Sequence, residues 1–324
     1  MKVLVTGGAG FIGSHLVDRL IADGHQVVII DNCSTGREDN LAHVREHPNL
    51  TFLRGSVLNE TLVAAAIGDG VDLVYHLAAA VGVHHVVQDP LWTIVTNTRG
   101  TELVLKRAAE HRVRVVFAST SEIYGQSDAI PFREDGERVL GATWIHRWAY
   151  STSKALDEHL CFAYADRGLP VSIVRYFNIY GTRMDPAGYG SVVAKFLSQA
   201  LGGEPLTIHG DGRQSRCFTH VREAVEATIR AGTEAAALGE VFNVGSPFEY
   251  TVSALADLIL RLTGSSSPLS YLTYEEAYGP RFADAPRRVP DVRKIERVLG
   301  WRAELPLEDG LRELIAERQA PVAA

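Results

Sequence analysis

The sequence predicts an α/β protein: a doubly wound parallel sheet with a smaller, mostly helical α/β second domain. Short β-branched runs alternate with longer stretches of helical period, and this alternation repeats six times. The predicted strands are almost continuously apolar, which indicates that helices cover both faces of the sheet. A run of glycines directly follows the first strand. These three observations together favour a doubly wound sheet over other α/β arrangements.

The elements of the sheet follow in chain order. Strands are predicted at Lys2–Thr6, His25–Ile30, Leu50–Arg54, Val71–Leu77, Val113–Ala118 and Val171–Tyr176. The first helix carries Ile12, Leu16 and Leu20 on one face and stops at Gly24. Further helical patterns occupy residues 59–67, 91–110 and 148–167.

Beyond about residue 178 glycine and proline become frequent and the alternation loosens. Helical patterns remain near residues 191–201, 221–231, 251–262, 291–299 and 307–318. Glu240–Val244 is expected to form a strand that returns to the main sheet. We therefore expect one domain of residues 1–177 plus about 215–248, and a second of about 178–214 plus 249–324.

Composition excludes several classes of protein. The net charge of −7, with no basic block, argues against nucleic-acid binding. The three cysteines have no metal-ligand spacing and suit a reducing compartment. No run approaches the ~18 apolar residues of a membrane helix, and the N-terminus does not resemble a signal peptide. We expect a soluble cytoplasmic protein with no metal, nucleic-acid or membrane partner.

A dinucleotide site is predicted where the first strand meets the first helix. Gly7, Gly10 and Gly13 would let the backbone approach a pyrophosphate, whose charge then lies at the helix N-terminus. Asp31 ends the second strand, where a carboxylate accepts hydrogen bonds from the adenosine ribose. Asp31 would repel a 2′-phosphate, so NAD is favoured over NADP, although the nearby Arg37 weakens that preference.

A second motif predicts hydride chemistry. Tyr150 and Lys154 stand four residues apart at the start of a predicted helix and therefore share one face. A nearby lysine is expected to lower the pKa of the tyrosine, which can then take a proton from an alcohol. The hydroxyl residues Ser119, Thr120 and Ser121 end the fifth strand, at the edge where such sheets bind ligands.

With these motifs in place, the sequence resembles the extended short-chain dehydrogenases/reductases over essentially its whole length. Leu77-Ala78-Ala79, Asn97 and the run from Arg175 to Gly181 also match. The resemblance implies hydride transfer at C4 of a UDP-sugar, with NAD held throughout the cycle. It also implies a homodimer, in which the helices near 91–110 and 148–167 form a four-helix bundle across a two-fold axis.

Within this family the sequence resembles the UDP-glucuronate decarboxylases most. The features that carry this resemblance are Glu122 after the hydroxyl run, Arg147 three residues before Tyr150, the sequence Arg216-Cys217-Phe218, and Arg288. One departure is Ser56, which stands where the family normally has an aspartate near the adenine. Such enzymes make UDP-xylose or a UDP-4-keto-pentose.

The resemblance assigns roles residue by residue. The expected catalytic residues are Tyr150, Lys154, Thr120, Ser121, Glu122 and Arg288. The expected cofactor contacts are Gly7, Gly10, Phe11, Ile12, Gly13, Asp31, Asn32, Ser34, Gly36, Arg37, Ser56, Leu77, Ala78, Ala79, Asn97, Ser119, Tyr150, Lys154 and Tyr176. The expected substrate contacts are Val81, Arg147, Asn178, Val192, Thr207, His209, Arg216, Tyr278 and Arg288.

Three other functions stay open from the sequence. A UDP-glucuronate or UDP-hexose 4-epimerase would use the same tyrosine and lysine. A 4,6-dehydratase would place an acidic pair after the hydroxyl run, and Ser121-Glu122 supplies only half of it. A non-catalytic NAD-binding regulator of this fold would not need the intact Tyr150 and Lys154 pair.

Overall fold

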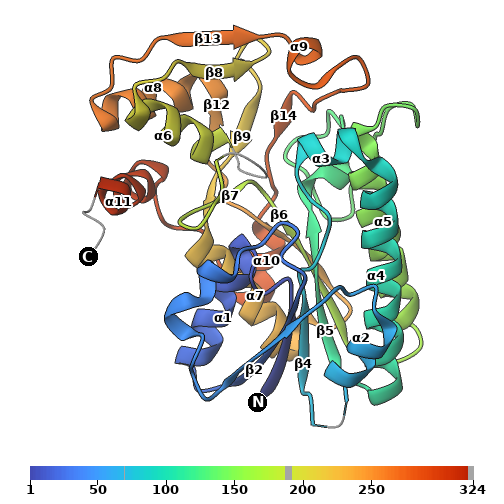
Figure 1. Ribbon diagram of the computed structural model, residues 1–324. Coiled ribbons are helices and arrows are strands. Elements are labelled where there is room, and N and C mark those ends of the chain that lie inside the picture. Colours follow the sequence, from blue (N-terminus) through green and yellow to red (C-terminus); the bar gives the residue numbers. More distant parts are fainter. Residues whose placement is uncertain (69, 187–191, 320–324) are drawn as a thin grey trace.

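The computed structural model describes residues 1–68, 70–186 and 192–319. Its centre is a parallel seven-stranded sheet in the order β11-β6-β5-β4-β1-β2-β3 (Figure 1). The strands are β1 (Lys2–Thr6), β2 (Gln26–Asp31), β3 (Leu50–Arg54), β4 (Leu73–His76), β5 (Arg114–Thr120), β6 (Val171–Tyr176) and β11 (Val241–Val244). The chain starts in the middle of the sheet and winds outward in both directions, which confirms the predicted doubly wound topology.

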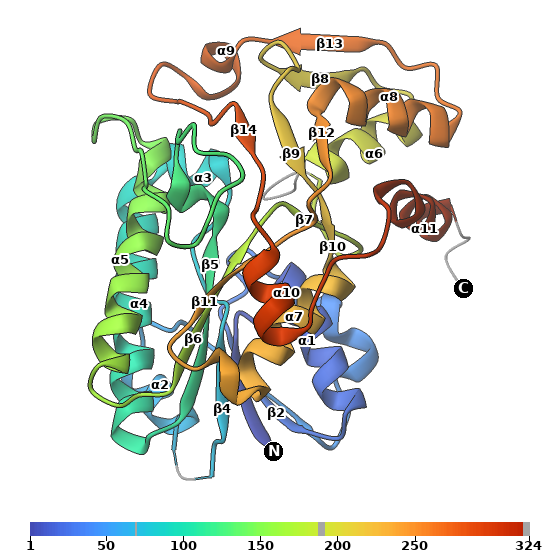
Figure 2. The same cartoon turned by 180° about the vertical axis from the view of Figure 1, so that it is seen from behind.

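Helices cover both faces of this sheet, as Figures 1 and 2 show from opposite sides. One face carries α1 (Phe11–Ala22), α7 (Val221–Thr233) and α10 (Arg293–Leu299); the other carries α2 (Glu60–Ala66), α4 (Pro90–His111) and α5 (Arg147–Ala165). Alternate residues of β1 divide between the two layers: Val3 and Val5 pack with α1, and Leu4 packs with α4. Burial on both faces explains why the strands are almost continuously apolar.

A smaller unit lies above the carboxyl ends of the strands (Figures 1 and 2). Its core is formed by α6 (Val192–Gly202), α8 (Val252–Thr263) and α11 (Leu307–Gln319) with the strand β8 (Leu206–His209). β13 (Leu269–Leu272) pairs with β8, and β9 (Ser215–Cys217) lies between β12 (Glu249–Thr251) and β14 (Arg287–Arg288). The remaining elements are β7 (Ile179–Tyr180), β10 (Thr219–His220), α3 (Val83–Gln88), α9 (Tyr274–Tyr278), η1 (Glu38–Val44), η2 (Ser121–Tyr124) and η3 (Ala235–Ala237).

The predicted strand at Glu240–Val244 does return to the main sheet, where Val241 of β11 pairs with Ile173 of β6. The short strands of the smaller unit were not predicted, because two to four residues give no readable alternation. Ser215–Cys217 lies outside the main sheet, in β9. The exact division of the chain into two domains therefore stays a proposal.

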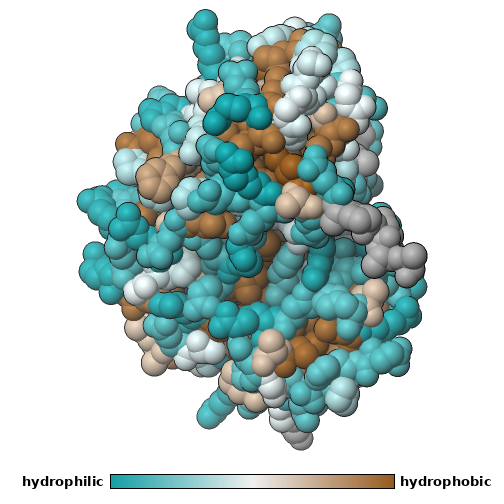
Figure 3. All heavy atoms as spheres, turned by 90° about the vertical axis from the view of Figure 1, so that its left-hand side faces the viewer, coloured by the Kyte–Doolittle hydropathy of each residue, from teal (hydrophilic) through white to brown (hydrophobic). Residues whose placement is uncertain are grey.

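The surface is largely polar on the face shown in Figure 3, where hydrophobic residues show in patches between hydrophilic ones. Among the described helices, none combines the length and the apolar character needed to cross a membrane.

Candidate active site

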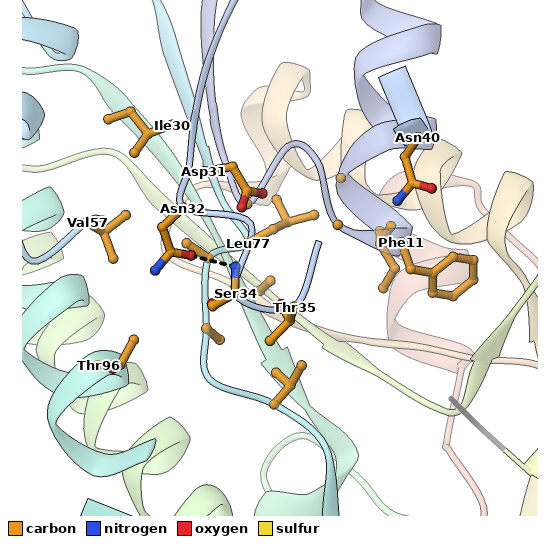
Figure 4. A pocket seen from close by; sticks show the side chains of 18 of the residues that line it. Phe11, Ile30, Asp31, Asn32, Ser34, Thr35, Asn40, Val57, Leu77 and Thr96 are labelled. Carbon is orange, nitrogen blue, oxygen red and sulfur yellow. Dashed lines mark hydrogen bonds between the residues drawn. The ribbon is translucent and has the colours of Figure 1, made fainter. Parts of the chain in front are cut away.

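A pocket opens where the strands of the main sheet end (Figure 4). Gly7 follows β1, Asp31 ends β2, Leu77 follows β4 and Ser119 lies near the end of β5, so the pocket occupies the carboxyl edge where open parallel sheets bind ligands. The lining residues among the expected cofactor contacts are Gly7, Gly10, Phe11, Ile12, Gly13, Asp31, Asn32, Ser34, Arg37, Ser56, Leu77, Ala78, Ala79, Ser119, Tyr150, Lys154 and Tyr176.

The glycine turn has no room for side chains. Gly7 has a φ of +74°, which favours glycine, and a Cβ there would lie 2.7 Å from the Ala78 nitrogen. A Cβ on Gly13 would lie 2.1 Å from the Gly7 oxygen. The first turn of α1 therefore packs tightly under the strand end, and the helix N-terminus faces a site suited to an anion.

Asp31 organises the part of the pocket that lies at the end of β2. Its two carboxylate oxygens accept hydrogen bonds from the backbone N–H groups of Ala9 (2.9 Å) and Cys33 (2.7 Å). Burial raises the pKa of Asp31, and these two N–H groups oppose the rise. Asn40 donates to the Ala9 carbonyl at 2.9 Å, so the loop after β2 is fixed against the glycine turn. The Arg37 side chain is largely exposed and pairs with Asp39.

Two expected cofactor contacts do not line the pocket. Gly36 packs against the glycine turn, where a Cβ would lie 2.7 Å from the Ala9 backbone. Asn97 accepts a hydrogen bond from the Ala80 nitrogen (2.7 Å) and donates to the Ser153 hydroxyl (3.0 Å). Both residues therefore lie outside the pocket surface, where they support the backbone and side chains that line it.

Tyr150 and Lys154 both line the pocket from α5. The phenol of Tyr150 interacts with the Thr120 hydroxyl, and Lys154 Nζ donates to the Ala118 carbonyl at 2.9 Å. Burial and the Glu122 carboxylate raise the pKa of Tyr150, although Arg147 and Thr120 oppose the rise. The expected lowering of this pKa by Lys154 is therefore not what the structure shows, because burial outweighs the local positive charge.

Glu122, Arg147 and Arg288 form one ion-pair cluster beside Tyr150, in which both arginines are buried. Glu122 in η2 pairs with Arg147 of α5, and its other oxygen lies 3.4 Å from Arg288 Nη1 of β14. Asp284 joins the cluster, since its carboxylate lies 3.1 Å from Arg288 Nη2 and 2.7 Å from Arg216 Nη2. Three guanidiniums and two carboxylates converge here, so the cluster carries a net positive charge.

The electrostatics of this cluster favour an anionic ligand. Burial pushes the pKa of Glu122 upward, but Arg147 and Arg288 outweigh it and hold that pKa below its usual value. Burial and the neighbouring Arg288 lower the pKa of Arg216 to about 10, against the opposing effect of Asp284. The Nε atoms of Arg147 and Arg288 are buried without a hydrogen-bond partner among the described residues. Such donors are suited to a carboxylate or phosphate oxygen.

The other expected substrate contacts lie mostly in the smaller unit. His209 of β8 hydrogen-bonds with Lys195 (3.1 Å) and with the Tyr278 hydroxyl (2.8 Å), and Thr207 interacts with Gln199. Asn178 donates to the Cys217 carbonyl at 3.1 Å, and Val192 begins α6. Val81 instead lines the pocket of the glycine turn.

Sequence reasoning missed several residues of this region. Asp284 lies in a loop without periodicity, and only its position four residues before Arg288 hinted at a partner. In the sequence, Lys195 cannot be distinguished from a surface lysine of a helix. The structure places it beside His209 of β8. Four further residues line the pocket but belong to no recognisable sequence motif: Thr35, Asn40, Val57 and Thr96 (Figure 4).

Comparisons with known proteins agree with this geometry. Residues 3–245 match the protein family described as NAD dependent epimerase/dehydratase family. A UDP-N-acetyl-alpha-D-glucosaminuronate decarboxylase of Bacillus cytotoxicus is 42% identical over 314 residues, covering 97% of this chain and 96% of the relative. UDP-glucuronic acid decarboxylase 1 of Danio rerio is 37% identical, covering 97% of this chain and 72% of the relative.

Solved structures show the same fold. The UDP-glucose 4-epimerase of Thermotoga maritima, solved with UDP-glucose, superposes with a TM-score of 0.89 at 32% identity, over 98% of this chain and 99% of the other. The UDP-glucuronic acid 4-epimerase of Bacillus cereus, solved with UDP-glucuronic acid and NAD, gives 0.87 at 29% identity, over 98% and 100%.

Proposed function

The chain belongs to the NAD-dependent epimerase/dehydratase family of extended short-chain dehydrogenases/reductases, and from that premise we propose that it is a UDP-glucuronic acid decarboxylase. The reaction passes through a 4-keto intermediate and gives UDP-xylose, a UDP-4-keto-pentose, or both. The observation that carries this proposal is the buried cluster of Glu122, Arg147 and Arg288 beside Tyr150. The names of two similar curated relatives support decarboxylation of a UDP-uronate, one being named for UDP-glucuronic acid and the other for UDP-N-acetyl-alpha-D-glucosaminuronate.

The pocket at the carboxyl edge of the sheet fits NAD. The close backbone packing at Gly7 and Gly13 leaves no room for side chains in the glycine turn, and the N-terminus of α1 offers N–H groups to a pyrophosphate. Asp31 and the loop after β2 would hold the adenosine ribose. Tyr176, Tyr150 and Lys154 line the opposite end, where the nicotinamide would lie. Bound NAD supplies the hydride acceptor for C4 of the sugar.

Residues of this chain would carry out the proton transfers of the reaction. Tyr150 takes the proton of the C4 hydroxyl, and Thr120 or Ser121 donates a hydrogen bond to the same oxygen. The resulting 4-keto uronate is a β-keto acid, so its carboxylate leaves as CO₂ while the electrons move onto the ketone oxygen. Protonated Tyr150 and the hydroxyl run stabilise that enolate oxygen.

The arginine cluster serves the carboxylate end of the sugar. Arg288 either contacts the carboxylate or delivers a proton to C5 through a water molecule. Arg147 adds a weaker carboxylate contact, and Glu122 positions the sugar. The UDP moiety would be held by residues of the smaller unit, namely Arg216, Asn178, Thr207, His209 and Tyr278. This division of labour makes the larger unit the NAD-binding part and the smaller one the part that binds the nucleotide sugar.

A homodimer in the cytoplasm belongs to the same proposal. Both α4 and α5 expose apolar side chains to solvent. These are Leu91 (70% exposed), Ile94 and Val95 on α4, and Leu156 and Phe162 on α5. These two helices pack side by side, so a second copy would bury both faces in a four-helix bundle. All three cysteines are free thiols, which supports a reducing compartment.

The proposed reaction is tested by incubating the purified protein with UDP-glucuronic acid and NAD while CO₂ and the sugar nucleotides are measured. Release of CO₂ with UDP-xylose or the 4-keto pentose supports the proposal. Formation of UDP-galacturonic acid without CO₂ overturns it and favours the 4-epimerase, the activity named for the similar solved structures. UDP-N-acetylglucosaminuronic acid is tested in parallel, because a curated relative is named for that sugar.

A further inference from the structure

A buried carboxylate lies next to the Tyr150 and Lys154 pair on the same helix. Asp157 follows Lys154 by three residues on α5, so both side chains leave the helix on one face. Asp157 is 0% exposed, and neither of its carboxylate oxygens forms a hydrogen bond of regular geometry with a described residue. The Thr101 hydroxyl of α4 faces it. The proposed reaction steps leave this carboxylate without a role.

Lys154 needs a negative charge nearby. Its side chain is 2% exposed, and its Nζ contacts the Ala118 carbonyl at 2.9 Å and lies 4.4 Å from the centre of the Phe117 ring. Neither contact carries a full negative charge. Burial lowers the pKa of Lys154, and Asp157 is the strongest of the groups that raise it. A buried ammonium without a counter-charge loses its proton.

Each of the other titratable groups near Lys154 is either paired with another charged group or neutral. Glu158 accepts hydrogen bonds from Arg175 Nε (3.0 Å) and Nη2 (2.6 Å), so its charge balances that buried guanidinium. Burial lowers the pKa of His76, which hydrogen-bonds with Thr101, to about 3. Burial also raises the pKa of the Cys161 thiol. Both are therefore uncharged near neutral pH. Burial raises the pKa of Asp157 to about 6, against the opposing effect of Lys154, so at neutral pH Asp157 is the anion without a charged partner among the described residues that face Lys154.

We propose that Asp157 is a positioning residue for the hydride-transfer step: its carboxylate, buried on the same face of α5, keeps the Lys154 ammonium charged beside Tyr150. This inference rests on the proposed function and adds to it a residue that touches neither cofactor nor substrate. Asp157 acts on both members of the pair, because its charge also raises the pKa of Tyr150. Loss of the charge therefore moves both titrations in the same direction, to lower pH.

The pH profile of the reaction distinguishes this role from simple packing. In Asp157→Asn, the alkaline limb of kcat is expected to move to lower pH by roughly 1–3 units, the effect of one close opposite charge. The acidic limb moves in the same direction by less. Asp157→Glu, which restores the charge, returns the profile toward wild type. A uniform loss of kcat with both limbs unmoved would overturn the proposal.

A second measurement needs no substrate and so separates this inference from the proposed function. The sequence has only five lysines, so isotope-labelled lysine side chains give few NMR signals, and Lys154→Arg identifies the one from Lys154. In the NAD complex, the proton dissociation constant of the Lys154 ammonium is expected to be at least about tenfold larger in Asp157→Asn than in wild type, so Lys154 loses its proton at lower pH. Unchanged titration in a folded variant overturns the proposal even if UDP-glucuronic acid is decarboxylated.

If Asp157→Asn does not fold, the same Lys154 titration in the wild-type protein tests the proposal. The Lys154 signal of wild type is expected to shift as Asp157 titrates, and absence of that step would contradict the inference. Glu102→Gln is the matched control, because Glu102 is a carboxylate on the outer side of α4 that pairs with Arg99. Its pH profile and its Lys154 titration should equal those of wild type.

Discussion

Arg147 and Glu122 form an ion pair whose guanidinium side chain is only 3% exposed, three residues before Tyr150 on the same helix. Breaking a buried pair leaves a charge without a partner, which is more costly than never having formed the pair. The structure has thus placed two opposite charges directly beside the proposed proton acceptor.

The first prediction concerns Tyr150→Phe. Without the phenol no group accepts the C4 proton, so NADH formation should fall by roughly 10²–10⁴-fold or more, while NAD still binds. Absorbance of NADH in single-turnover mixing measures the loss, and calorimetry measures NAD binding. Tyr271→Phe, an exposed residue of β13, serves as the control. Retention of full hydride transfer would remove Tyr150 from its proposed role.

The second prediction uses two adjacent arginines of β14. Arg288→Ala should slow CO₂ release by about 10²-fold or more and leave NAD affinity unchanged, because Arg288 belongs to the buried cluster and not to the glycine pocket. Arg287→Ala is the matched control, since Arg287 is 54% exposed and pairs with Glu249. Equal CO₂ release by the two variants would show that the cluster has another purpose.

Glu122→Gln gives the third prediction, on stability and rate together. The amide keeps the shape but leaves Arg147 and Arg288 without their shared carboxylate, so the free energy of unfolding should fall by about 3–5 kcal/mol. Denaturant unfolding measures this loss. CO₂ release should slow more than NAD binding weakens. A variant as stable as wild type would mean that water already balances these arginines.

The fourth prediction concerns the choice of cofactor. Asp31→Ala should weaken NAD by about tenfold to a hundredfold, the value of hydrogen bonds to a charged group, and should reduce discrimination against NADP. Asp39→Ala removes an exposed carboxylate of the same region and should change neither affinity. If Asp31→Ala and wild type bind the two cofactors alike, Asp31 only organises its loop.

The fifth prediction concerns acid stability. Burial and the nearby Lys154 lower the pKa of His76 to about 3, whereas an unfolded histidine titrates near ~6.5. Between those values the unfolded chain binds more protons, so stability is complete above about pH 6.5 and falls by about 1.4 kcal/mol per pH unit for this residue as pH decreases. His76→Gln should reduce that slope by about one proton in denaturant titrations. An unchanged slope would mean that His76 is charged in the fold.

The sequence by itself determined the main sheet and its nucleotide edge. Long apolar strands and the Gly7–Gly13 turn are local signals, because burial on both faces and a tight turn each demand particular residue types within a short window. Spacing along a helix is equally local, so Tyr150 and Lys154 could be placed on one face before any fold was known.

Only the tertiary structure decided which charges meet. Glu122 and Arg147 lie far along the chain from Asp284 and Arg288, and β14 pairs with β9 where Arg288 reaches Glu122. Asp157 looks like an ordinary helical carboxylate in the sequence, and its burial against α4 is what couples it to Lys154. Pairing and desolvation depend on distance in space, and a pattern along the chain carries no record of that distance.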